Sequence, residues 1–235
     1  MISIRKINAL YQKNMKNMIS NSYILLPLIL VVAIAFLFTM QLDYDATNED
    51  KVTMLAILVG MSLMTVGATT MAILISEEKE KHTLGVLITS TVSGLDFLIS
   101  NVLTSLTVII VANIAIYYIV PAEGLLLTDF LLVTSVGAVA AITLGAIMGL
   151  LAKNQAAAST MLTPLLLLPV IPAFFADNFF VDNVLYYMFT EQMGVAMSGL
   201  IEGGISWSSA GIMTVNIVVF AIIFGIFYRK SGLAA

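Results

Sequence analysis

Long apolar stretches alternate with short polar ones along this 235-residue chain. Six of the apolar stretches are long enough to cross a bilayer as α-helices, since about 20 residues at 1.5 Å each cover the hydrocarbon core. A helix also satisfies its own backbone hydrogen bonds in lipid. The pattern therefore predicts six membrane-spanning helices, at about residues 23–40, 53–75, 98–120, 128–151, 159–176 and 210–228.

The stretch before the first span has a different pattern. Residues 2–18 carry apolar side chains at spacings of three and four, with basic side chains on other faces. This is typical of an amphipathic helix that lies in a membrane interface. The basic residues expected near lipid headgroups are Arg5, Lys6, Lys13 and Lys16. A basic tail beside the membrane is the alternative.

The stretch before the last span is mixed. Residues 177–209 include Glu191 and Gln192 in the middle of an apolar run. A charge at the bilayer centre costs about 3 kcal/mol, which argues against a seventh crossing. We expect short re-entrant or interfacial helices here, broken at Gly203 and Gly204.

Segment 128–151 carries small residues at steps of four, which places them on one helical face. Such a face lets helix backbones approach closely in lipid. The residues are Gly137, Ala141, Gly145 and Gly149. They predict helix packing within a subunit or between two, and a lining for a substrate path is the alternative.

Segment 159–176 contains three prolines, Pro164, Pro169 and Pro172. Proline removes a backbone donor and crowds the preceding turn of a helix. We therefore expect this span to be kinked or to end early.

Composition agrees with this pattern. The chain is 60% hydrophobic and 10% charged, and its mean hydropathy is +1.04. These values lie outside the range of soluble domains. The expected fold class is an all-α integral membrane protein with a single transmembrane domain over residues 1–235. The chain has no cysteine, which excludes disulfides and Cys-based metal sites.

The basic residues predict the orientation. Six crossings would place both termini on one side of the membrane, together with nine of the ten Lys and Arg residues. Because short cytoplasmic loops are enriched in Lys and Arg, both termini are expected to be cytoplasmic, in the plasma membrane. The nine residues are Arg5, Lys6, Lys13, Lys16, Lys79, Lys81, Lys153, Arg229 and Lys230, and only Lys51 lies opposite.

Several kinds of chemistry are missing from the sequence. It has no G-x-x-x-x-G-K-[ST] phosphate loop and no H-E-x-x-H zinc motif. The only histidine, His82, falls in a predicted cytosolic loop, which excludes a Ser–His pair inside the membrane. No internal repeat supports an inverted-repeat carrier. We expect no enzyme activity, no metal, no cofactor bound by this chain and no nucleic-acid partner.

Residues 76–98 hold the densest charge in the chain. Five consecutive charged residues, Glu77 to Lys81, extend the second span into the cytosol. Thr83 can cap a new turn, and Ser93 and Asp96 form a capping-box pattern before the third span. Apolar residues recur at helical spacing between them, at Leu84, Leu87, Ile88 and Val92. The pattern predicts a short amphipathic helix that docks a partner, and a solvated connecting loop is the alternative.

The stretch E-K-E-K-H-T-L-G-V-L-I-T-S-T-V-S resembles the segment between spans two and three of type-2 ABC exporter permeases. The family pattern runs approximately E-K-E-x-G-T-L-x-x-L-x-x-[ST]-P-[VI]-[ST]. The sequence departs from it at His82, where the family has glycine, and at Thr91, where it has proline. Both departures affect the local turn. The matching positions are Glu78, Lys79, Glu80, Thr83, Leu84, Leu87, Ser90, Val92 and Ser93.

The resemblance implies a permease that pairs with a second copy or a related permease and binds two cytosolic ATPase subunits. The short helix in loop 76–97 would be the coupling helix, and ATP and Mg would bind to the ATPase. Carried over by position, the docking residues are Glu78, Glu80, Thr83, Leu84, Leu87 and Ile88. The implied function is ATP-driven export. The predominantly apolar spans favour an amphipathic or hydrophobic cargo, such as a peptide, toxin, antibiotic or lipid-like molecule. The alternatives are a secondary carrier or channel without an ATPase, and a membrane anchor or sensor.

Overall fold

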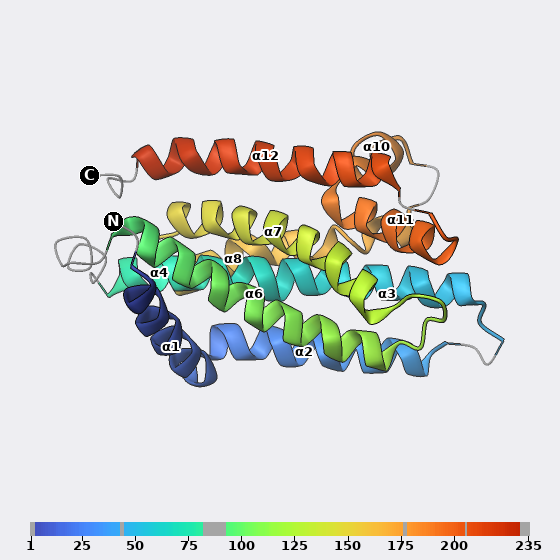
Figure 1. Ribbon diagram of the computed structural model, residues 1–235, viewed down its shortest axis with the longest axis horizontal. Helices are drawn as coiled ribbons and strands as arrows, with labels where there is room; N and C mark the ends of the chain where they lie inside the picture. Colours follow the sequence, from blue (N-terminus) through green and yellow to red (C-terminus); the bar gives the residue numbers. More distant parts are fainter. Residues whose placement is uncertain (1–2, 43–44, 82–92, 176–177, 205, 231–235) are drawn as a thin grey trace.

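The fold is an elongated bundle of helices, seen in a computed structural model (Figure 1). The structure describes residues 3–42, 45–81, 93–175, 178–204 and 206–230. Five helices in this part of the chain are long and apolar enough to cross a membrane. They are α2 (Ser22–Met40), the continuous helix Asn48–Glu80, α6 (Gly94–Ile119), α7 (Leu127–Leu151) and α12 (Trp207–Lys230).

The second of these helices forms the centre of the bundle. It consists of α3 (Asn48–Ser62), a π-helical segment η1 (Leu63–Ala68) and α4 (Thr69–Glu80). Of its most apolar stretch, 94% is buried, compared with 17% for α2 and 6% for α12. Its 33 residues measure about 50 Å, which exceeds a hydrocarbon core of about 30 Å. The helix therefore extends beyond the membrane at one end or at both.

The six-span prediction is not confirmed. The described part of the predicted span 159–176 is not one helix. It contains the end of α8 (Gln155–Leu162), a 3-10 segment η2 (Thr163–Leu167) and α9 (Ile171–Phe174). The physical reason is the predicted one, because Pro164 and Pro172 open the second and third pieces. The broken segment still runs from one end of the bundle toward the other (Figure 1).

The remaining elements cover the two ends of the bundle. The first helix, α1 (Ile4–Ser20), lies at an angle to the long helices, at the end where both termini are found (Figure 1). The opposite end carries α10 (Phe179–Asn183), η3 (Leu185–Tyr187) and α11 (Phe189–Ile201). The chain turns after α11 at Gly203, whose φ of +84° lies in the left-handed region that glycine adopts without strain. Glu191 and Gln192, which argued against a seventh span, both lie in α11.

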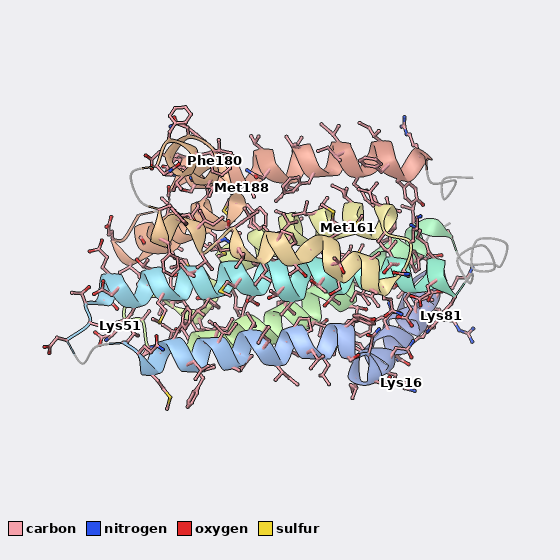
Figure 2. All side chains as sticks on the ribbon, turned by 180° about the vertical axis from the view of Figure 1, so that it is seen from behind. Lys16, Lys51, Lys81, Met161, Phe180 and Met188 are labelled. Atoms are coloured by element: carbon pink, nitrogen blue, oxygen red, sulfur yellow. The ribbon has the colours of Figure 1, made fainter. Side chains whose placement is uncertain are left out.

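The basic residues lie at the ends of the bundle. Figure 2 shows Lys16 and Lys81 at one end and Lys51 at the opposite end. The arrangement of these three residues agrees with the predicted distribution of Lys and Arg, in which Lys51 alone lies on the side opposite the termini. The orientation relative to a membrane stays a prediction.

Candidate functional site

The C-terminal turn of α4 is more buried than its charge suggests. Glu77 and Glu78 are 7% and 5% exposed, although they begin the run of five charged residues. A buried carboxylate is costly unless it is paired or hydrogen-bonded. Both have a cationic partner, because Glu77 pairs with Lys81 one turn later and Glu78 pairs with Lys13 of α1.

Lys79 joins α4 to the end of α7. Its ammonium group donates hydrogen bonds to the backbone carbonyl oxygens of Leu150, at 2.7 Å, and of Ala152. These carbonyls lie at the C-terminus of α7, where the last four carbonyls of a helix have no partner within it. A cation at this position also interacts favourably with the helix dipole. Lys79 therefore caps α7 from a neighbouring helix.

Glu80 joins α4 to the start of α8. Its Oε2 accepts a hydrogen bond of 3.1 Å from the backbone N–H of Gln155, the first residue of α8. The side chain of Gln155 in turn accepts a 2.8 Å hydrogen bond from Asn21, which lies between α1 and α2. The end of α4 is thus bonded to α1, α7 and α8, and we call Glu77–Lys81 with these contacts the α4 junction.

A second set of polar contacts joins α1 to α6. The Asp96 carboxylate accepts a 2.9 Å hydrogen bond from the backbone N–H of Ser3, and Asn14 donates to Asn101 at 2.8 Å. Asp96 also forms the capping box with Ser93 that the sequence predicts. The helix α1 and its N-cap residue Ser3 therefore contact the chain on both sides of residues 82–92, at Glu78 before them and at Asp96 after them.

The predicted interfacial residues point in different directions. Arg5, Lys13 and Lys16 are exposed on α1, and Lys6 is half-buried near Asp96. Their placement at a lipid surface stays a prediction.

The predicted docking residues divide into two groups. Glu78 and Glu80 lie in the α4 junction, where they contact other helices of the same chain. The other four, Thr83, Leu84, Leu87 and Ile88, lie outside the described residues, as do His82 and Thr91. Docking of an ATPase on this loop stays a prediction.

The small residues of α7 face the central helix. A Cβ atom added at Gly145 would lie 2.1 Å from the carbonyl oxygen of Ala68, and one at Gly149 would lie 2.8 Å from that of Ala72. Gly137 lies against Leu63, and Ala141 is fully buried beside Gly67. The backbones of α7, η1 and α4 therefore approach so closely that side chains do not fit between them.

A cavity of about 620 Å³ opens between α2, the central helix and α8–η2. Its walls include apolar side chains of α2 and several hydroxyl groups. Tyr23, Leu26 and Leu30 of α2 form part of the apolar wall. The hydroxyl groups belong to Thr65, Thr69 and Ser159. Thr65 lies within the π-helical segment η1 and Thr69 follows it directly. Such a departure from regular helix is frequent at functional sites. Such a surface suits a ligand with apolar and polar parts.

Two features of the α4 junction were missed by sequence reasoning. The cap formed by Lys79 could have been found, because Lys79 continues the spacing of Ala72 and Ile75, which face Gly149. The Lys13–Glu78 pair could not, since it joins residues 65 positions apart. In the part of the chain that the structure describes, no three His, Cys, Asp or Glu side chains are grouped to hold a metal ion.

The comparison with known families identifies the chain. The sequence model of the family described as ABC-2 type transporter matches residues 5–172. No curated protein matches the chain. Permease subunits of this family lack an ATPase domain and generally pair with separate ABC ATPase subunits. The match covers well over half of the sequence, and the chain therefore belongs to the ABC-2 type transporter family as a multi-pass permease subunit.

Proposed function

We propose that this permease exports an amphipathic or hydrophobic molecule, such as a peptide, toxin, antibiotic or lipid-like compound, across the cytoplasmic membrane. A separate ATPase, with two copies for a pair of permeases, docks on loop 76–97 and supplies the energy. The pair contains two copies of this chain or one copy and a relative. ATP and Mg bind to the ATPase, and both termini of the permease are cytoplasmic.

The observation that carries the proposal is the α4 junction. Residues 82–92 follow directly after Lys81, and the helical turn before them is bonded to α1, α7 and α8. A force applied to the loop would therefore act on four helices together. Because packed helices transmit displacement with little compression, a movement of the ATPase would reach the spans through this junction.

The cavity beside α2 supports an amphipathic cargo. It is about 620 Å³, within the range of about 300–1,000 Å³ that small-molecule pockets occupy. It is bounded by the π-helical segment of the central helix and by the proline-broken segment, and neither is a regular α-helix. Irregular backbone at membrane depth is tolerated where it lines a cavity. No observation favours a carrier or channel that works without an ATPase.

Replacement of Leu87 by aspartate is expected to abolish stimulation of the ATPase. A charge placed in a predicted apolar docking surface must be desolvated without a partner, which costs several kcal/mol. The measurement is the ATP hydrolysis rate of the reconstituted complex, with Leu126→Asp as the matched control. Leu126 is 66% exposed and precedes α7 at the opposite end of the bundle. A Leu87→Asp complex that hydrolyses ATP at the wild-type rate would contradict docking at this loop.

A further inference from the structure

A second cavity, of about 300 Å³, lies between α3 and α11. Its polar wall includes Thr53, Thr190, Glu191 and Ser198, and its apolar wall includes Ile57 and Pro169. It is separate from the cavity beside α2, with which it shares no residue. Met188, the residue before α11, lies in the half of the bundle that carries Lys51 (Figure 2).

This cavity brings together an unsatisfied hydroxyl and a carboxyl that forms no ion pair within the described residues. The Thr190 side chain is 4% exposed, and its hydroxyl has no hydrogen-bond partner there. The Glu191 carboxyl is half-buried, and neither of the ion pairs in this part of the chain includes it. Buried polar groups are nearly always hydrogen-bonded in folded proteins. The Thr190 hydroxyl is such an exception, and together with the neighbouring Glu191 carboxyl it indicates a site for a polar ligand.

The charges around the cavity indicate the sign of that ligand. The elements packed against α11 include α3, α7, α12 and η3. At this end of the bundle the only cationic residue on them is Lys51 of α3, which does not pair with Glu191, and Arg229 and Lys230 of α12 lie at the opposite end (Figure 1). The other titratable side chains on these elements at the α11 end are acids or phenols. They are Glu49 and Asp50 of α3, Asp129 of α7, and Tyr186 and Tyr187 of η3. The cavity therefore favours a cation.

We propose that this cavity binds a protonated primary amine carried on a short apolar chain. The Glu191 carboxylate pairs with the ammonium group and the Thr190 hydroxyl accepts one of its hydrogen bonds, since an ammonium group has three donors. The alkyl chain lies against Ile57 and Pro169. A volume of about 300 Å³ is at the lower end of the range for ligand pockets, which suits a ligand of this size.

The ionisation of the Glu191 carboxyl predicts how binding of the amine depends on pH. Burial raises the pKa of Glu191 to about 7. Only the ionised carboxylate pairs with an ammonium group, so binding is expected to weaken as the pH falls below about 7. An alkylamine itself stays protonated throughout this range, since its pKa is close to the value of about 10.4 found for lysine.

The binding can be measured with a fluorinated probe. The 19F resonance of 4,4,4-trifluorobutylammonium is expected to broaden saturably with the full-length protein in lipid nanodiscs. At pH 8 the affinity should fall at least tenfold in Glu191→Gln and several-fold in Thr190→Val, and stay unchanged in Glu202→Gln, which alters an exposed acid just after the same helix. From pH 8 to pH 6 it should fall about tenfold in the wild type, following a pKa of about 7.

The control ligand is 4,4,4-trifluorobutanol, which has the same tail and no charge. Its broadening should not differ between the wild type and Glu191→Gln. Equal binding of the ammonium probe to these two proteins, or no saturable binding to either, would overturn the proposal. Whether the natural ligand is the exported cargo depends on the proposed function. The binding measurement needs no ATPase, and its failure would leave export untouched.

Discussion

Replacement of Gly145 by alanine is expected to destabilise the protein severely, because the added methyl group has no space. Its Cβ would lie 2.1 Å from the carbonyl oxygen of Ala68 and 2.7 Å from the Ala68 Cα, and both are backbone atoms of the central helix. A flexible side chain could move aside, but a buried backbone cannot move without separating two helices. Overpacking costs about 1–3 kcal/mol in ordinary cores and more where the neighbours cannot move.

The effect should be graded along α7. At Gly149 the nearest atom is 2.8 Å away, so Gly149→Ala should cost less than Gly145→Ala. The matched control is Gly225→Ala in α12, where nothing lies within 4 Å of an added Cβ. That variant should be neutral or stabilising by up to about 1 kcal/mol, since alanine is the better helix former. Thermal unfolding of the three purified variants in detergent gives the comparison. Equal stability of Gly145→Ala and Gly225→Ala would show that α7 and the central helix are not this close.

Reversal of either charge in the Lys13–Glu78 pair is expected to uncouple ATP hydrolysis from transport and to lower stability. Glu78 is buried, and its carboxylate accepts a hydrogen bond from the Lys13 ammonium group. Loss of a hydrogen bond to a charged group costs about 1.5–3 kcal/mol. In Lys13→Glu, two carboxylates would also face each other, so α1 should separate from the end of α4.

The double variant Lys13→Glu with Glu78→Lys restores opposite charges and should recover most of the coupling and stability. Lys16→Glu is the matched control, because Lys16 is exposed on the same helix. The carboxylate introduced by Lys16→Glu is expected to have little effect on coupling or stability. The measurements are ATPase stimulation, cargo uptake into inside-out vesicles and thermal unfolding. If the double variant is no better than the two single variants, the pair does not join α1 to α4 in the working complex.

The long helices could be predicted from the sequence because hydrocarbon imposes a minimum apolar length. The predicted boundaries of the second span, 53–75, lie well inside the observed helix Asn48–Glu80, since hydropathy detects the apolar part and not the ends. The segment 159–176 met the same length criterion and was counted as a span. Its prolines, noted as a source of a kink, in fact divide it into three pieces.

The polar contacts of the site were less predictable. The charged run Glu77–Lys81 is expected from its sequence to lie in water, yet Glu77 and Glu78 are buried. Their neighbours include residues of α1 and α8, which are distant in sequence. The cavity at Glu191 depends in the same way on how α11 packs against α3. Local spacing fixes which face of a helix a residue occupies, and only tertiary packing decides what that face meets.

The central claim is that loop 76–97 contacts the ATPase that drives transport, and site-directed cross-linking tests it most directly. The chain has no cysteine, so single-cysteine variants need no altered background. A benzophenone attached at Leu87→Cys is expected to cross-link the ATPase subunit in the assembled complex, with a yield that changes when ATP binds. The same label at Leu126→Cys, at the opposite end of the bundle, should give no such product. A complex that transports cargo while Leu87→Cys forms no ATPase cross-link, or that gives equal cross-linking from both positions, would contradict the account.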